Sequence, residues 1–450
     1  MLKDAHGLAI STDSPEAVRG FDDTLQGYLK YRADAGKRLQ KALDADPECG
    51  LLHVLKGCFA MLAYRQSLVP AAQEAAAAAR RLTANATPRE QAHAAALTAW
   101  ADGEIERALS IWEGIFRDHP HDILAFRLHH FNSFWLGRPE AMAGAAEGIL
   151  PRWGAELPGY GSVLACRSFA QEECGNYTVA EAAGRAAIAL DPGDLWAAHA
   201  VAHVMEMQGR RSEGIAWIAD LEKHWEGGNN LLHHLWWHRA MYHLERREFA
   251  MVLDLYDRRF RNQQSPLTQA MPDLYIDVQN AASMLFRLAR HGVDVGDRWT
   301  ELADKAEARI GDCLSAFTLP HWMMALTATG RWEAAQRMLD GMRDFARGNS
   351  GTAAPIVARY ALPVSEAVLK HAQGDHAAAV AAMRPALGGM HALGGSHAQQ
   401  DVLEQLFLDA AMRAGLTEDV RLLLERVAGR HPVPPERRIG YAEAARAVAY

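Results

Sequence analysis

Internal repetition is the feature that most constrains the fold of this chain, because a repeated unit has to stack on copies of itself. Three similar phrases, ALDADPECGLLH, FRDHPHDILAF and IALDPGDLWAAH, contain Pro47, Pro120 and Pro192. The intervals between these prolines are 73 and 72 residues. Each interval equals two units of about 36 residues, a length typical of helical repeat units. The spacing therefore predicts one repeat array rather than a series of unrelated domains.

A recurring turn marker shows the period of a single unit. A glycine or a basic residue precedes each of several short helical starts, first at Gly103, Gly137, Gly175 and Gly209, at intervals of 34, 38 and 34 residues. The same marker recurs with wider spacing at four later positions, Arg247, Gly330, Gly374 and Gly415. Glycine at the end of a helix accepts the left-handed conformation that a tight helical hairpin needs.

Small-residue stretches at 73–81 and 372–383 predict closely packed helices, and strand signals are sparse. A period of 34 residues, with alanine at the helix crossings and proline after the second helix, matches the tetratricopeptide pattern. We therefore expect an all-α, tetratricopeptide-like α–α superhelix of roughly ten to twelve hairpins. It forms a single α-solenoid over residues 1–450, with less regular segments near 150–161, 262–273 and 348–355.

Charge and cysteine content exclude several classes of protein. The chain has 47 Lys and Arg against 55 Asp and Glu, a net charge of −8, so no attraction to nucleic acid or anionic lipid is expected. The 5 cysteines lack close paired spacing, which argues against a disulfide framework. The uncharged stretch 313–330 contains Pro320 and His321, which favours a buried inner helix over a membrane span. A soluble, cytoplasmic protein without a signal peptide is expected, with a homodimer as one option.

Histidines are abundant, 21 in all, and many fall in the first helices of the predicted hairpins. They are His129, His130, His199, His203, His233, His234, His238 and His321. At about 100° per residue, His199, His203 and Glu206 share one helix face, and His234 lies one turn from His238. First helices line the inner surface of such a superhelix, so this pattern predicts a histidine-lined groove.

The histidine pattern has three interpretations. The first is a network of neutral imidazoles bonded to one another, to Glu206 and to indole N–H groups. The second is a polar ligand pocket that uses the histidines as hydrogen-bonding and acid–base groups. The third is a site for a divalent metal such as zinc, in which Glu206 is a ligand or a base. Its ligands would be His199, His203, His234 and His238.

Two further groups of polar residues have simpler explanations. The turn GGSHAQQD places Ser396 as a helix N-cap, and capping is favoured there over anion binding. Asp277, Asn280 and Arg287 could point inward, although polar pairing between buried helices is the favoured interpretation.

Phrases along nearly the whole chain resemble the tetratricopeptide repeat protein 38 family. They include LKDAHGLAIST, FDDTLQGYLKY, DHPHDILAF, LHHFNSFWLG, WAAHAVAHVMEM, HHLWWHRAMYHLE, MLFRLARHGVDVGDRW and LGGSHAQQDV. The resemblance implies an all-helical fold and no settled activity. It also implies a glutamate at Glu206 and the turn that contains Ser396, Gln399 and Asp401. The histidines that it implies are His130, His199, His203, His234, His238 and His321. His129 and His233 depart from that pattern, so they are left out of the predicted site, and His397 stands where Asn is common.

These residues support three hypotheses about function. The first is a module that binds a small polar ligand or a peptide through His130, His199, His234, Trp237, His321, Ser396, Gln399 and Asp401. The second is a hydrolase or lyase-type enzyme with Glu206, His203 and His238 as catalytic groups, with or without a divalent metal. The third is a protein-interaction scaffold. The enzyme hypothesis requires the four histidines of the metal set to converge around one point.

Overall fold

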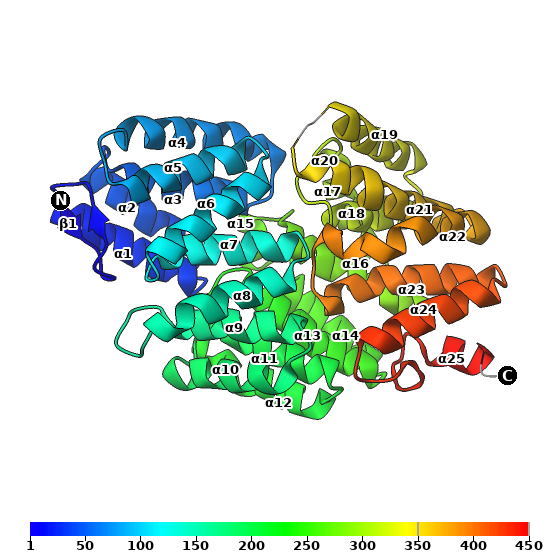
Figure 1. The fold of residues 1–450 in the computed structure, drawn as a ribbon. Helices are drawn as coiled ribbons and strands as arrows, with labels where there is room; N and C mark the ends of the chain where they lie inside the picture. Colours follow the sequence, from blue (N-terminus) through cyan, green and yellow to red (C-terminus); the bar gives the residue numbers. More distant parts are fainter. Residues whose placement is uncertain (349–350, 449–450) are drawn as a thin grey trace. The chain divides into compact units, whose positions relative to one another are not determined.

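The computed structural model describes residues 1–348 and 351–448, which form helices apart from one short hairpin (Figure 1). That hairpin pairs β1 (Leu2–Lys3) antiparallel with β2 (Ala9–Ile10), with Leu2 opposite Ile10. The repeat pattern did not predict it. Internal contacts divide the chain into two compact units. Unit 1 comprises Met1–Val201 and Asp220–Leu232, and unit 2 comprises Ala202–Ala219 and His233–Tyr450. The expectation of one continuous array stays a prediction.

Unit 1 is built from consecutive helical hairpins. Its helices are α1 (Pro15–Leu29), α2 (Ala35–Ala45), α3 (Gly50–Leu62), α4 (Val69–Leu82), α5 (Pro88–Ala101), α6 (Ile105–Asp118), α7 (Ile123–Trp135), α8 (Pro139–Ile149), α9 (Tyr160–Glu173) and α10 (Tyr177–Leu190), with 3₁₀ turns η1 (Gln66–Leu68), η2 (Leu150–Arg152) and η3 (Glu222–His224). Neighbours in sequence pack together, as in the pairs α1–α2, α3–α4, α5–α6 and α9–α10. The helices α11 (Leu195–Met207), α12 (Arg211–Leu221) and α13 (Leu231–Glu245) each contribute residues to both units.

Unit 2 continues the pattern with more irregular turns. Its remaining elements are α14 (Phe249–Leu255), the π-helix η4 (Tyr256–Phe260), α15 (Pro266–Ala270), α16 (Tyr275–Arg290), α17 (Arg298–Ala308), α18 (Thr318–Ala328), α19 (Trp332–Gly348), α20 (Ala353–Ile356), the π-helix η5 (Val357–Ala361), α21 (Leu362–Ala372), α22 (His376–Met383), the 3₁₀ helix η6 (Arg384–Leu393), α23 (His397–Arg413), α24 (Thr417–Arg430), the 3₁₀ turn η7 (Pro435–Arg437) and α25 (Ala442–Val448). Pairs such as α17–α18, α21–α22 and α23–α24 pack together.

The turn marker found in the sequence falls at hairpin turns. All of its positions have positive φ angles: Gly103, Gly137, Gly175, Gly209, Arg247, Gly330, Gly374 and Gly415. At Gly175, between α9 and α10, φ is 80°, a conformation that glycine accepts without a steric penalty. Arg247 takes the same role between α13 and α14 with φ of 60°, and a residue with a Cβ atom is strained there.

Two expectations about irregular and apolar segments can be compared with the structure. Segment 150–161 contains η2 and a loop, segment 262–273 contains only the short α15, and residues 349–350 of segment 348–355 lie outside the described part. The uncharged stretch forms α18, in which residues 318–327 are all buried, so the expected inner helix is confirmed. Across the described ranges, no helix combines the length and apolarity needed to cross a bilayer.

Close packing between α9 and α10 depends on small residues on α10. Ala180, Gly184 and Ala187 are buried, and a Cβ atom at Gly184 would lie 2.5 Å from Val201 Cγ2 and 2.7 Å from Ser168 Oγ. Ser168 cannot easily move away, because its hydroxyl donates to the carbonyl of Ala180 at 2.7 Å. The small-residue face is therefore a requirement of the helix crossing.

Replacing Gly184 with alanine is expected to lower the free energy of unfolding by about 1–3 kcal/mol, the usual effect of overpacking. Urea denaturation measures this change. The matched control is Gly36→Ala in α2, where an added Cβ meets nothing within 4 Å. That control should be neutral or stabilising by up to about 1 kcal/mol, because alanine is the better helix former. Equal stability of both variants would contradict the close approach.

Candidate functional site

Three histidines of unit 2 converge from two helices. His203 lies on α11, and His234 and His238 lie one helical turn apart on α13. The ring centroids of His203 and His238 are 4.4 Å apart, those of His234 and His238 are 4.7 Å apart, and those of His203 and His234 are 6.5 Å apart. Each ring offers a nitrogen within 4.8 Å of the others. The three side chains therefore surround one point in the interior of the unit.

Hydrogen bonds orient two of the three rings. His238 donates from Nδ1 to Glu206 Oε2 at 2.6 Å, and His234 donates from Nδ1 to Asn280 Oδ1 at 2.8 Å. A neutral imidazole carries one N–H, so the bond to Asn280 puts the lone pair of His234 on Nε2, and the lone pair of His238 lies on Nε2 when Glu206 is a carboxylate. Trp237 stacks on His234 with ring centroids 5.2 Å apart and an angle of 10° between the ring planes. Acceptors behind the rings and a stacked indole hold the imidazoles in place.

Burial keeps the three imidazoles neutral. His203 and His238 are 0% exposed and His234 is 2% exposed. Burial lowers the pKa of His203 and His234 well below the usual value and that of His238 to about 3. For His203, the nearby rings of His238 and His234 lower the pKa further. Neutral imidazole is the form that binds metal ions.

Glu206 is the acidic group next to these rings. Its pKa is raised to about 8, mainly by burial and in part by Asp401, against the opposing effect of Arg287 and Arg438. A cavity of about 30 Å³ lies beside Glu206, also lined by Glu245 and Arg438. This volume is enough for a water molecule, which needs at least about 10–15 Å³. Glu206 can therefore exchange a proton with a water molecule near neutral pH.

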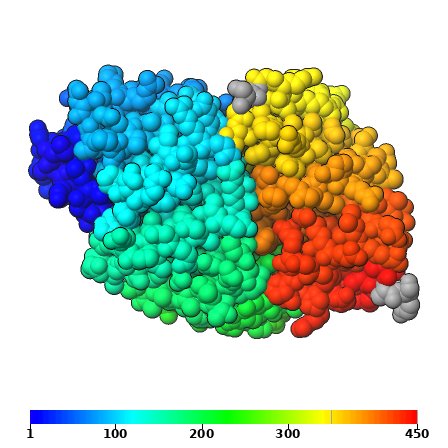
Figure 2. All heavy atoms as spheres, viewed as in Figure 1, coloured from blue at the N-terminus to red at the C-terminus, as the bar shows by residue number. Residues whose placement is uncertain are grey.

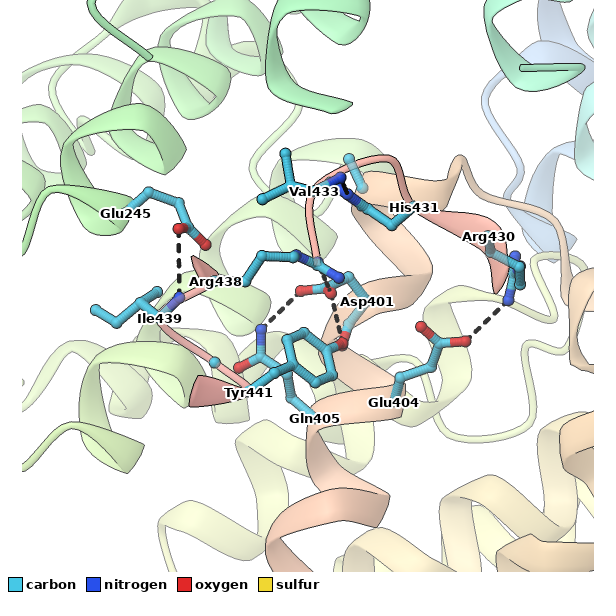
Figure 3. A network of polar contacts seen from close by, with 12 residues as sticks. Glu245, Asp401, Glu404, Gln405, Arg430, His431, Val433, Arg438, Ile439 and Tyr441 are labelled. Carbon is cyan, nitrogen blue, oxygen red and sulfur yellow. Dashed lines mark hydrogen bonds and ion pairs between the residues drawn. The ribbon is translucent and has the colours of Figure 1, made fainter. Parts of the chain in front are cut away.

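Asp401 lies on the wall of the same cavity and is held by several side chains (Figure 3). Its Oδ1 accepts from Arg438 and from the hydroxyl of Tyr441, each at 2.5 Å. Its Oδ2 accepts from Gln405 at 2.7 Å and from Arg287 at 3.2 Å. Burial alone would raise the pKa of Asp401, but the two guanidinium groups outweigh it and hold the pKa far below its usual value. Asp401 therefore ties the C-terminal segment to α23 and α16.

The turn before α23 is a helix cap in the structure. Ser396 Oγ accepts from the backbone N–H of Gln399 at 3.3 Å, and Gln399 Oε1 accepts from the backbone N–H of Ser396 at 3.0 Å. This reciprocal pair is a capping box, as the favoured interpretation of the sequence expected. Gln399 also donates to Gln279 at 3.3 Å, which links α23 to α16.

His321 of unit 2 has a local partner of its own. On α18, it donates from Nδ1 to the carbonyl of Phe317 at 2.8 Å, and burial lowers its pKa to about 4. His233 donates to Asp277 Oδ2 at 2.9 Å, so this residue belongs to a buried pair between α13 and α16. The structure thus shows polar pairing between buried helices at Asp277 and Asn280, as the favoured interpretation expected.

The other predicted histidines belong to unit 1. His130 on α7 is 0% exposed and packs among aromatic rings, with Phe126 at 6.1 Å and Trp196 at 6.3 Å between centroids. His199 lies one turn before His203 on α11 and stacks on Trp196 at 4.6 Å and on Phe169 at 5.4 Å. In unit 1, the two histidines therefore line an aromatic core.

Sequence reasoning missed the partners that orient this site. Nothing in the sequence paired Asn280 with His234, because the two residues lie 46 positions apart. It also missed the C-terminal residues Arg438 and Tyr441, which complete the contacts of Asp401. The segment HPVPPERRIGY is interrupted by prolines and rich in arginine. This composition could have indicated an irregular segment that packs on the helices, rather than another helical repeat.

Comparison with models of known protein families found no match for the chain. Among solved structures, the crystal structure of yeast Tom70 is 13% identical, with 96% of this chain and 95% of that chain covered and a TM-score of 0.39. The structure of Naa15/Naa10 bound to HypK-THB is 11% identical, with 92% and 68% covered and a TM-score of 0.26.

The class of the protein follows from the hairpins themselves. Antiparallel helix pairs with left-handed turn residues succeed one another through the described ranges, and the only strands there are β1 and β2. Both units are therefore all-α and are built from tetratricopeptide-like helical hairpins.

Proposed function

We propose that unit 2 binds a divalent transition-metal ion through His203, His234 and His238, and that zinc is the best chemical match. The observation that carries the proposal is the convergence of three buried imidazole nitrogens within 4.8 Å. Imidazole suits zinc, copper, iron and nickel, and histidine is a common zinc ligand in proteins. The burial of the cluster favours an ion over a peptide on an open face.

The acceptors behind the rings support the same proposal. Imidazoles that ligate metals usually donate their other N–H to a carboxylate or carbonyl oxygen, which fixes the tautomer and makes the ring more basic. The Nδ1 atom of His238 is hydrogen-bonded in this way to Glu206, and the Nδ1 atom of His234 to Asn280. A nearby dication would also lower the pKa of Glu206 from about 8 and favour its carboxylate form.

The site supports a hydrolase or lyase-type reaction with Glu206 as the group that moves a proton. A bound zinc ion supplies Lewis acidity and lowers the pKa of a coordinated water. Glu206 borders a cavity large enough for water, and its raised pKa of about 8 suits proton transfer near neutral pH. Trp237 stacks on His234 and restricts the orientation of that imidazole.

Isothermal titration of chelator-treated protein with zinc chloride tests this proposal. We expect one zinc ion per chain and a loss of affinity of at least about 100-fold in His203→Ala and in His238→Ala, since each removes a ligand. Glu206→Gln keeps an acceptor for His238 and should cost about tenfold, the lower end for an outer partner. His224→Ala, at an exposed histidine of η3, should bind like the wild type. Zinc binding that survives both ligand variants, or no binding to the wild type, would contradict the proposal.

Several finer expectations stay predictions from the sequence. They are membership of the tetratricopeptide repeat protein 38 family, a cytoplasmic location, a homodimer, and recognition of a small molecule or peptide. The scaffold hypothesis also stays open, because surfaces outside the buried cluster can dock a partner protein.

A further inference from the structure

A groove on unit 1 is lined by none of the residues proposed to bind the metal. It has a volume of about 490 Å³ and is lined by α6, α7, α8, Pro120 and Arg152. Small-molecule sites in proteins span about 300–1,000 Å³, so the groove has room for a compact ligand. The wall of the groove includes three buried apolar or aromatic side chains, those of Phe116, His129 and Ile149. The α6–α8 part of the chain is drawn in cyan to turquoise in Figure 2.

The floor of the groove on α8 is made of small residues. Gly144 and Gly148 lie one helical turn apart, both line the groove, and both are exposed. A Cβ atom at either position would meet nothing within 4 Å. Glycine inside a helix costs about 0.5–1 kcal/mol relative to alanine. No close packing within the described ranges requires these two glycines, so the structure leaves open space on this face of α8.

His129 brings a polar group to the same groove. The residue is 6% exposed, and its Nδ1 atom is buried without a hydrogen-bond partner among the described residues. Burial lowers its pKa to about 4, and Arg138 lowers it further, so the ring is neutral. A buried polar atom without a partner costs about 1–3 kcal/mol. A ligand group seated beside the imidazole can recover part of this cost by hydrogen bonding to the ring.

The charges around the groove favour an acidic ligand. Arg117 and Arg152 are exposed and line it, together with a single acidic residue, Glu113. Within the described part of the chain, the ion pair of Arg117 is a 3.4 Å contact with its exposed neighbour Asp118. Such an exposed pair contributes little, so the guanidinium can exchange it for a ligand. Guanidinium groups bind carboxylates with paired, charge-assisted hydrogen bonds.

The end of the groove is held in place before any ligand arrives. Trp153 donates from Nε1 to the carbonyl of Pro120 at 2.8 Å, and His121 donates from Nε2 to the carbonyl of Arg152 at 2.8 Å. The rings of His121 and Trp153 also meet edge to face at 5.7 Å. These contacts tie the α6–α7 turn to η2, and a preformed wall reduces the entropy lost on binding.

We propose that this groove is a binding site for a small carboxylic acid with an apolar body, which packs over Gly144 and Gly148 and pairs its carboxylate with Arg117 and Arg152. Inside the groove, the ligand forms a hydrogen bond with His129. The site is separate from the histidine cluster of unit 2 and does not depend on the proposed metal.

Ligand-observed NMR titration with hydrocinnamate tests the proposal, with hydrocinnamyl alcohol and phenylpropylamine as neutral and cationic counterparts. We expect hydrocinnamate to bind saturably and at least about tenfold more tightly than the amine, because only the acid complements the arginines. Gly144→Leu fills open space and improves helix propensity, so the fold should persist while binding weakens at least about tenfold. His129→Phe keeps a ring in place and removes the hydrogen bond, with a loss of several-fold expected.

The controls separate recognition of the acid from general apolar binding. Arg117→Gln combined with Arg152→Gln should weaken hydrocinnamate about tenfold and leave the alcohol unchanged. Gly36→Ala, at an open position of α2 outside the groove, should bind like the wild type. Equal affinity for the acid, the alcohol and the amine would overturn the proposal. Wild-type binding by the Gly144→Leu variant would overturn it as well.

Discussion

Replacing Asp401 with asparagine is expected to lower the free energy of unfolding by about 3–5 kcal/mol, the usual cost of breaking a buried ion pair by removing one partner. Asp401 accepts hydrogen bonds from Arg287, Arg438, Gln405 and Tyr441. Arg287 is 0% exposed and Arg438 is 9% exposed, so the variant leaves two guanidinium groups buried without their carboxylate. Urea denaturation followed by far-UV circular dichroism measures the loss.

Two comparisons test whether the ion pair causes this loss. Glu418→Gln breaks an exposed pair with Arg421, whose side chains are 45% and 80% exposed, and should change stability by less than about 1 kcal/mol. Arg438→Met combined with Asp401→Asn should be less destabilising than the sum of the single changes, because one uncompensated charge is then absent. Additive losses would show that Asp401 and Arg438 act independently, contrary to the expectation.

Lowering the pH of the metal-free protein from about 7.5 to about 5 is expected to reduce the free energy of unfolding by about 5 kcal/mol, because about 8 kcal/mol is lost at four buried histidines and about 3 kcal/mol is regained at Glu206. In the folded state His203, His234, His238 and His321 have pKa values below the usual 6.5. The unfolded chain therefore binds protons below pH 6.5 while the folded chain does not. Stability is full above that value and falls by about 1.4 kcal/mol per pH unit for each group.

Glu206 opposes this trend and offers a sharp control. Its folded pKa is raised from 4.5 to about 8, so its contribution to stability is lost as the pH rises and regained as the pH falls. The Glu206→Gln variant has no such gain, and it should lose more stability than the wild type over the same interval. Urea midpoints in a chelator at the two pH values measure both proteins. Equal stability of the wild type at the two pH values would show that the imidazoles are not held neutral.

The helical hairpins were the most predictable part of this protein. A hairpin turn in the left-handed conformation favours glycine, so its position can be predicted from the local sequence. The positions predicted in this way, from Gly103 to Gly415, all have positive φ angles, including Arg247. The assignment of His203, His234 and His321 to first helices was equally local, because helix periodicity decides which residues share a face. The hairpin β1–β2 was missed because two residues per strand are too few to show alternation.

The groove on unit 1 could not have been found from the sequence. His129 was set aside because it departs from the family pattern, yet it lines the groove with a buried ring nitrogen. In the sequence, Gly144 and Gly148 cannot be distinguished from the other small residues of an alanine-rich helix. Only the packing of α6, α7 and α8 shows that nothing covers them.

The sequence by itself determined the helical class, the places where the chain turns and the helices that carry histidine. These features depend on contacts within a few residues, where backbone conformation and the 3.6-residue period act directly. The tertiary structure alone decided that His203, His234 and His238 meet, that Asn280 and Glu206 stand behind two of them, and that the C-terminal Arg438 neutralises Asp401. The hydrogen bonds among them join residues 32 to 46 positions apart, and their geometry depends on how whole helices pack.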